Sequence, residues 1–178
     1  MQLSDLELMR RVADGDQLAF STLLDRHSKM VLNRVYRIVL SRDDAEDLCQ
    51  EVFERLWKQA PEWRDEAKIT TWLYRVENNS ALNFRQRVQR RHVLDEDLVE
   101  FIVDSDAQEF STNQDDDSVV LDALASLPDN QRAAMAFRFY QEIPVKEIAA
   151  IMGLSAKAVE SLLSRAKNQL RLSIGGRK

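Results

Sequence analysis

Residues 144–172, PVKEIAAIMGLSAKAVESLLSRAKNQLRL, predict two short helices joined by a tight turn. The first helix has apolar residues at helical spacing: Val145, Ile148, Ala149 and Met152. Gly153 suits the turn because glycine tolerates a positive φ, and Ser155 is a good N-cap for a second helix from Ala156. The second helix repeats the apolar stripe at Val159, Leu162, Leu163 and Ala166.

The outer face of the second helix is polar and able to reach phosphates and base edges. It carries Lys157, Glu160, Ser161, Ser164, Arg165 and Lys167. Two helices cross closely only where the contact residues are small, and Ala149, Gly153 and Val159 resemble the pattern of a DNA-binding helix-turn-helix. From these residues alone, an ordinary helical hairpin with a solvated outer face remains an alternative.

Composition favours helices throughout the chain. Of 178 residues, 44% are hydrophobic and 31% charged, with only four Gly and three Pro. The single cysteine, Cys49, excludes an internal disulfide and a cysteine-rich zinc site; we expect it to act as a small buried residue in a reducing compartment. No signal peptide is visible, and no apolar run approaches the roughly 20 residues of a membrane helix. We therefore expect a soluble cytoplasmic protein.

Charge is strongly segregated along the chain, although the net charge is only −5. Residues 1–92 carry a balance of +1, residues 93–131 a balance of −12 without any Lys or Arg, and residues 132–178 a balance of +6. An acidic connector thus separates a near-neutral front module from a basic rear module. Because local charge determines polyanion binding, the net charge does not exclude nucleic acid as a partner.

The helical pattern predicts an all-α protein of two small modules. In the front module, a capping box at Ser4 and Glu7 opens a helix that ends near residues 14–16. Further helices are predicted over residues 17–40, 43–59 and 70–91, with Ser41–Asp44 as the cap of the second, a loop at 61–68, and Thr70 or Thr71 as the last cap. In the rear module, helices over residues 119–127 and 128–140 precede the helical hairpin.

The helix over residues 43–59 presents a row of carboxylates opposite its apolar face. The polar residues of this row are Asp43, Asp47, Gln50, Glu51 and Glu54. Like charges at i, i+4 and i+8 repel one another, so this face suits a basic partner helix, although a solvated acidic face is the simpler reading. No histidine joins the row, and we expect neither a metal site nor a cofactor.

The helix over residues 69–91 carries a polar stripe that suits nucleic acid. The stripe consists of Asn79, Asn83, Arg87, Arg90 and Arg91, with Arg85 beside it. Arginines contact phosphates and asparagines can bond base edges, while Trp63, Trp72 and Tyr74 lie upstream where aromatic faces could stack unpaired bases. The alternative is that Trp72 and Phe84 belong to the core and the asparagines are ordinary surface residues.

Three stretches together resemble the extracytoplasmic-function (ECF) sigma factors, the two-domain class of the sigma-70 family of bacterial RNA polymerase. They are DDAEDLCQEVFERLW, TTWLYRVENNSALNFRQRVQRR and SLPDNQRAAMAFRFYQEIPVKEIAAIMGLSAKAVESLLSRAKNQLR. The resemblance implies a non-enzymatic subunit that binds core polymerase, recognises promoter −35 and −10 elements and promotes DNA melting. It also implies a region 2-like domain over 1–92, an acidic linker over 93–118, and a region 4-like helix-turn-helix domain over 119–178.

The resemblance also implies a role for each polar set. The clamp helices of the largest polymerase subunit would contact Asp43, Asp47, Gln50, Glu51 and Glu54. The −10 element would be melted, read or held at its backbone by Trp63, Trp72, Asn79, Asn83, Arg85, Arg87, Arg90 and Arg91. A base flipped out of that element would enter the loop at 60–70. The −35 element would be read by Lys157, Glu160, Ser161, Ser164 and Arg165. An anti-sigma factor is a plausible further partner.

Some residues depart from the family pattern. Glu77 adds a negative charge beside the DNA-facing stripe, and Pro144 stands where a serine cap is usual. Glu160, Leu162 and Ser164 replace basic or aromatic residues, which suggests a weak −35 contact or a different sequence preference.

Two other classes of protein are alternatives to a sigma factor. A stand-alone helix-turn-helix regulator would bind its operator tightly without polymerase. An enzyme has little support, because His27 and His92, expected at the surface, form no catalytic pattern with Cys49.

Overall fold

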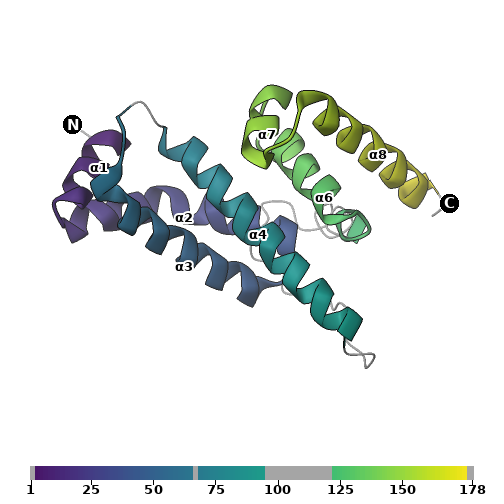
Figure 1. Ribbon diagram of the computed structural model, residues 1–178, viewed down its shortest axis with the longest axis horizontal. Coiled ribbons are helices and arrows are strands. Elements are labelled where there is room, and N and C mark those ends of the chain that lie inside the picture. The colour runs from purple at the N-terminus through teal and green to yellow at the C-terminus, as the bar shows by residue number, and fades with distance from the viewer. Residues whose placement is uncertain (1–2, 66–67, 95–121, 176–178) are drawn as a thin grey trace.

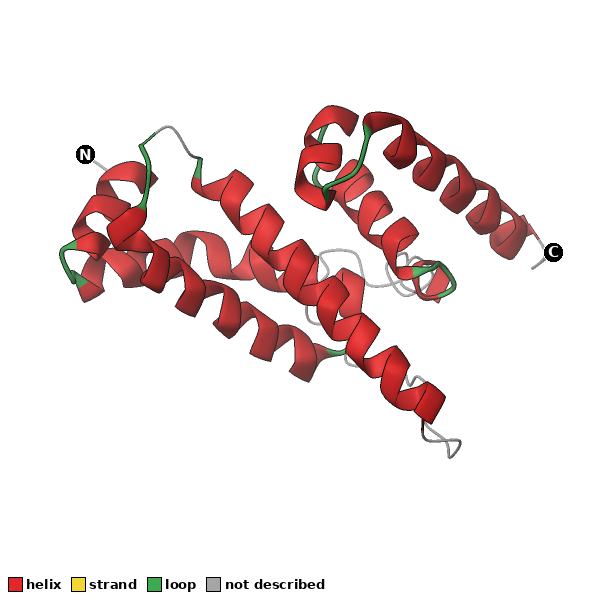
Figure 2. Ribbon diagram, in the orientation of Figure 1, coloured by secondary structure: helices red, strands yellow, loops and turns green. Residues whose placement is uncertain are grey.

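The computed structural model describes residues 3–65, 68–94 and 122–175, and every element within these ranges is a helix (Figure 2). The front module contains α1 (Asp5–Ala13), α2 (Gln17–Val39), α3 (Arg42–Gln59), the 3-10 turn η1 (Ala60–Glu62) and α4 (Ile69–Leu94). The rear module contains α6 (Asp129–Met135), the π-helical turn η3 (Ala136–Tyr140), α7 (Val145–Met152) and α8 (Ala156–Gly175). The predicted all-α fold is confirmed. From residue 95 to its end, the predicted acidic linker lies outside the described residues.

The starts of α1 and α3 follow the predicted caps. Ser4 and Glu7 form the capping box of α1, and the Ser41 side chain caps α3. The prediction that Thr70 or Thr71 caps the next helix is wrong, because α4 already begins at Ile69. The Trp72 N–H donates to the carbonyl of Lys68 at 3.2 Å, so the first helical bond forms upstream of both threonines.

The front core lies where α2, α3 and α4 pack against one another, with α1 across one end (Figure 1). Helices α2 and α3 contribute the apolar faces that their spacing predicts. Fully buried members include Leu23, Val31, Val35, Val52, Leu56, Leu73 and Ala81. Cys49 is a buried free thiol, as predicted. Among the described residues, no helix is long and apolar enough to cross a membrane.

The rear module contains the predicted helix-turn-helix. Gly153 ends α7 with φ +67°, in the left-handed region that glycine tolerates, and the Ser155 hydroxyl accepts the N–H of Ala158 at 3.2 Å to cap α8. Pro144 is the N-cap residue of α7. The two apolar stripes meet in a rear core through Ile148, Ala149, Val159, Leu163 and Ala166. This packing leaves the outer face of α8 exposed.

Buried charge connects α2 to α4 in a way that the sequence did not reveal. Arg34 and Glu77 are 5% and 1% exposed, and the Arg34 Nε donates to Glu77 Oε2 at 2.5 Å. Glu77 therefore points into the core, and the prediction that it lies beside the DNA-facing stripe is wrong. Burial raises the pKa of the Glu77 carboxyl, and the bonds from Arg34 partly offset that increase.

His27 also differs from its predicted position. The prediction placed it at the surface, but its side chain is buried, and its Nε2 lies 2.8 Å from the Asp5 carboxylate at the start of α1. Asp5 also accepts a bond from Arg26 at 2.7 Å. Burial acts to raise the pKa of Asp5, but these two partners outweigh it and lower the pKa overall. The side chain of His92 lies outside the described residues.

The two modules touch along α2 and α4. The Arg132 guanidinium of α6 is 1% exposed, and its Nε donates to the carbonyl of Ile38, near the end of α2, at 2.9 Å. Tyr74 of α4 meets Phe137 of η3 edge to face, with ring centroids 6.1 Å apart. Figure 1 shows α6 and α7 beside α4. The rear module thus covers one side of the helix that bears the predicted nucleic-acid stripe.

Candidate functional site

The predicted carboxylate row on α3 divides between two surfaces. Asp43 and Asp47 are exposed near the start of the helix. Gln50 and Glu54 border a groove shared with α2, whereas Glu51 lies on the side facing α4, where it pairs with Arg55. The row is therefore not one continuous contact surface.

An apolar groove lies between α2 and α3. Its volume is about 540 Å³, and its apolar walls are formed by Phe20, Leu24, Phe53 and Trp57. Phe20 and Trp57 meet edge to face, with centroids 5.0 Å apart. The polar rim consists of Gln17, Gln50, Glu54 and Lys58. Sequence reasoning missed this groove because Phe20 and Trp57 belong to different helices and meet only through the packing of α2 on α3.

Four residues of the predicted stripe on α4 lie exposed in one row: Asn79, Asn83, Arg87 and Arg90. The side chain of Arg91 lies outside the described residues. The row continues into a polar pocket of about 360 Å³ between α3 and α4. That pocket is lined by Glu51, Arg55, Ser80, Asn83, Gln86, Arg87 and Arg90.

Arg85 faces a different direction from the rest of the stripe. Its side chain is 15% exposed, and its Nε donates to the Asp129 carboxylate of α6 at 3.0 Å. Asp129 also pairs with Arg132. In this arrangement, the guanidinium predicted to hold DNA lies at the contact between the modules.

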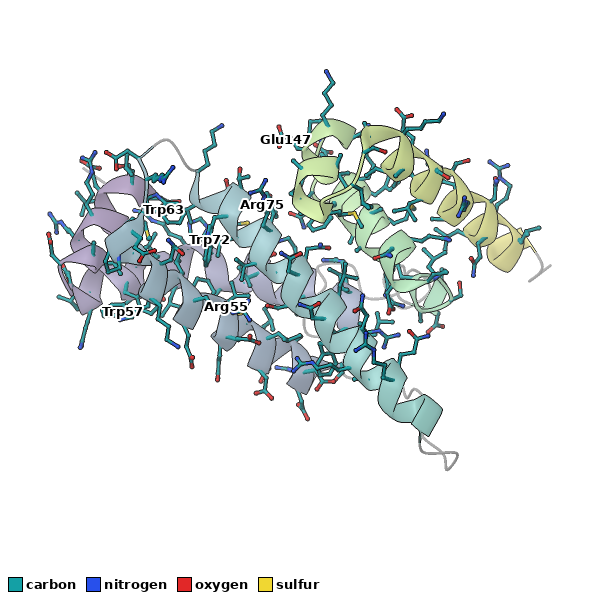
Figure 3. All side chains as sticks on the ribbon, viewed as in Figure 1. Arg55, Trp57, Trp63, Trp72, Arg75 and Glu147 are labelled. Carbon is teal, nitrogen blue, oxygen red and sulfur yellow. The ribbon has the colours of Figure 1, made fainter. Side chains whose placement is uncertain are left out.

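Trp63 and Trp72 pack together at the start of α4 (Figure 3). Their ring centroids are 6.0 Å apart with an edge-to-face angle of 67°, and both rings pack against the front core. Both side chains are half-buried. The indole Nε1 of Trp63 is buried without a hydrogen-bond partner among the described residues. The loop between them includes residues 66–67, which lie outside the described residues.

The predicted recognition helix α8 presents most of its polar set to solvent. Lys157, Glu160, Ser164 and Arg165 are exposed, and Ser161 is half-buried. Lys167, on the same helix, lies over the Phe139 ring with its Nζ 5.2 Å from the centroid. A polar helix face held on a rigid hairpin is the geometry with which proteins enter a DNA major groove.

Comparison with known proteins identifies two matched segments. The Sigma-70 region 2 family matches residues 23–91, and the Sigma-70, region 4 family matches residues 118–170. The ECF RNA polymerase sigma-E factor of Haemophilus influenzae is 30% identical over 97% of this chain and 96% of its own length. The sigma-E factor of Escherichia coli K12 is 32% identical over 95% of this chain and 93% of its own length.

A solved structure supports the same fold. The sigma factor RpoE of Bartonella quintana, in complex with the anti-sigma factor NepR, superimposes with a TM-score of 0.71 at 21% identity. The match covers 89% of this chain and 98% of that chain. The similarity therefore extends through both helical modules.

Proposed function

This chain belongs to the ECF sigma factors of the sigma-70 family and directs promoter-specific initiation by RNA polymerase, and on that premise we propose a division of the task between its modules. Residues 1–92 form the region 2-like domain, which binds core polymerase and the −10 element. Residues 119–178 form the region 4-like domain, which binds the −35 element. Residues 93–118 connect the two domains.

The polymerase contact is centred on the groove between α2 and α3. Its aromatic walls supply apolar area, and Gln50 and Glu54 at its rim supply polar and acidic contacts. Asp43 and Asp47 extend the polar surface along α3, whereas Glu51 contributes from the side of the helix that faces α4. A buried aromatic centre with a charged rim is typical of stable protein interfaces. This surface suits the clamp helices of the largest polymerase subunit.

The −10 contact is centred on the exposed row of α4. Asn79 and Asn83 present amides to bases, and Arg87, Arg90 and Arg91 hold the DNA backbone, with Arg85 beside them. Trp63 and Trp72 stand at the other end of the helix, next to the loop that we propose receives a flipped base (Figure 3). Unstacking a base costs a few kcal/mol, which contacts in the loop must offset for the duplex to open.

The −35 contact is the outer face of α8. Lys157 and Arg165 supply phosphate or guanine contacts, and Glu160, Ser161 and Ser164 supply further polar contacts. Among these five residues, two cations stand against one carboxylate, so this set binds DNA weakly by itself. Polymerase therefore supplies most of the affinity, as expected for a subunit that selects promoters only within the holoenzyme.

The protein works in the cytoplasm, where polymerase and promoter DNA are found, and as a specificity subunit it performs no catalysis itself. Its solved neighbour RpoE is complexed with the anti-sigma factor NepR. We expect an anti-sigma factor to bind this chain as well and to compete for the surfaces described above.

The observation that carries this proposal is the coexistence, on one front module, of an apolar groove with a polar rim and an exposed Asn–Arg row. Reconstituted transcription tests it: the chain plus bacterial core polymerase should initiate at specific promoters, and either component alone should not. Glu54→Lys should weaken core binding, and Glu46→Lys, on the same helix but away from the groove, is the matched control. Equal effects of the two substitutions would contradict the assignment of the groove. Tight operator binding without polymerase would indicate a stand-alone regulator instead.

A further inference from the structure

The middle of α4 is packed through polar side chains, where a core helix is ordinarily packed through apolar ones. Leu73 and Ala81 are fully buried, and the buried residues between them are Glu77, Asn78 and Ser80. The side-chain oxygens of Asn78 and Ser80 are buried without a hydrogen-bond partner among the described residues. Neither of these two oxygens therefore fixes the orientation of the helix.

Apolar spacing alone does not select one orientation of α4 either. Val76 and Leu82 are both half-buried, and six residues of an α-helix place them about 120° apart around its axis. Trp72 and Phe84 are also half-buried, and twelve residues again place them about 120° apart. A helix whose apolar side chains surround much of its circumference lacks the single stripe that decides which side faces the core.

Arg34 of α2 supplies a directional contact to two residues of α4, which packs against α2 (Figure 1). Its Nε donates to Glu77 Oε2 at 2.5 Å, and its Nη2 donates to Glu77 Oε1. One turn earlier on α4, the centroid of the Tyr74 ring lies 4.6 Å from the guanidinium carbon. A bidentate pair requires one geometry, and rotating α4 out of it would leave a buried charge unpaired, which is strongly unfavourable.

The orientation that pairs Glu77 with Arg34 places Asn79 outside. Asn79 is exposed, whereas its neighbours at 77, 78, 80 and 81 are all buried. At 3.6 residues per turn, Asn79 lies about 160° from Glu77 around the helix axis, and Asn83 follows one turn later on the same side. A rotation by one residue, about 100°, would turn both asparagines away from this exposed position.

We propose that the Arg34–Glu77 pair is a positioning element for promoter opening, which fixes the rotation of α4 so that Asn79 and Asn83 face the DNA strand. Both members of the pair are buried, so they act through the helix and do not touch DNA. The proposal rests on the proposed function, in which the two asparagines present amides to bases. It adds to that function the residues that aim them.

Thiol labelling of the full chain measures the rotation. Asn79→Cys and Ser80→Cys place a thiol at adjacent positions, the first exposed and the second buried. Iodoacetamide should label the first at least about tenfold faster, because a buried thiol reacts slowly. In the Arg34→Met/Glu77→Leu background, which keeps the site filled without its directional bonds, this ratio should fall at least about threefold. Leu73→Met, a volume-conserving change in the same core, is the matched control and should leave the ratio unchanged.

Promoter opening measures the consequence for function. The holoenzyme, formed from core polymerase and the full chain, is placed on a promoter found by the transcription assay, and permanganate reactivity of unpaired thymines reports open complexes. The double variant Arg34→Met/Glu77→Leu should bind core polymerase normally but open about tenfold less DNA, the size of one lost base contact. Asn79→Ala should reduce opening in the wild-type chain and add little in the double variant, because the pair and Asn79 act as one unit.

Two results would overturn the proposal: an unchanged labelling ratio in the double variant, or additive effects of the double variant and Asn79→Ala on opening. Circular dichroism and slow labelling of the buried Cys49 show whether each variant is folded. If the double variant does not fold, Glu77→Gln replaces it, since this change keeps the side-chain shape and removes the charge; a labelling ratio equal to that of the wild type would overturn the proposal equally. A wild-type holoenzyme that still initiates leaves the proposed function intact in each case, whereas one that fails to initiate contradicts the proposed function itself.

Discussion

Glu77 and Arg34 form a charged pair inside the front core, where each side chain depends on the other. Glu77→Ala leaves the Arg34 guanidinium buried without its carboxylate, although it still lies 4.6 Å from the centroid of the Tyr74 ring. We expect the free energy of unfolding in urea to fall by about 3–5 kcal/mol, as when one partner of a buried ion pair is removed. The double variant Arg34→Met/Glu77→Leu should recover much of that loss. If Glu77→Ala lowers the free energy of unfolding by less than about 1 kcal/mol, the pair contributes little to stability.

Cys49 should report unfolding through its reactivity. Burial raises the pKa of its thiol to about 11, and the nearby Glu77 charge acts in the same direction. At pH 8, only about one thiol in a thousand is then a thiolate, the form that reacts. Iodoacetamide should label native protein slowly, label urea-unfolded protein quickly, and label native protein faster as the pH approaches 11. Equal rates in the native and unfolded proteins at pH 8 would contradict this protection.

Residue by residue, the sequence predicts the apolar faces better than the buried polar groups. Leu23, Val52 and Val159 are buried as their spacing predicts, because periodicity reports directly which side of a helix avoids water. Glu77 and His27 were misplaced because a polar side chain on a helix is expected to face water. What buries them is a partner on a distant segment: Arg34 lies 43 residues from Glu77 and Asp5 lies 22 residues from His27.

The turn between α7 and α8 depends on one backbone conformation. Gly153 has φ +67°, and no atom lies within 4 Å of the position that a Cβ would occupy. Gly153→Ala therefore meets no steric contact, and its effect comes from the left-handed backbone alone, about 1–2 kcal/mol. Urea denaturation should show that loss without a change in helix content at low denaturant. Unchanged stability would indicate that the turn relaxes to a different conformation.

Helix α8 should determine −35 binding through Arg165. The side chain is exposed on the predicted recognition face, so Arg165→Ala should weaken holoenzyme protection of the −35 element while leaving folding intact. DNase footprinting measures the effect, and Arg171→Ala, exposed further along the same helix and outside the predicted set, is the control. An unchanged footprint at −35 would remove Arg165 from the DNA contact.

Helix starts that have a strong N-cap residue were predicted correctly, whereas a helix start that lacks one was not. Ser4, Ser41 and Ser155 each accept a backbone N–H where the sequence predicts a cap. The start of α4 lacked such a signal, and two adjacent threonines suggested the wrong residue. The aromatic groove was missed for a related reason: Phe20 and Trp57 meet only through the packing of α2 on α3.

At the scale of the whole molecule, the contact between the modules depends on Asp129 and Arg132. Asp129 binds Arg85 of the front module and Arg132 of its own helix, while Arg132 also reaches the carbonyl of Ile38. Asp129→Asn keeps the shape of the side chain but removes the charge, so we expect the modules to separate more often. Small-angle scattering should then show a larger radius of gyration. Asp122→Asn, exposed in the same module, is the control, and equal radii for both variants would contradict the role of Asp129.

The contact between Asp129 and Arg85 has a consequence for promoter binding. The −35 and −10 elements of a promoter lie about 25 base pairs apart, which is about 85 Å of duplex at 3.4 Å per base pair. Modules in direct contact cannot span that length, so they must part before both elements are bound. If Arg85 binds a DNA phosphate as predicted, the Asp129 carboxylate takes the place of that phosphate before DNA binds. Promoter DNA then competes with the Asp129 carboxylate for the Arg85 guanidinium, and added salt weakens both of these ion pairs.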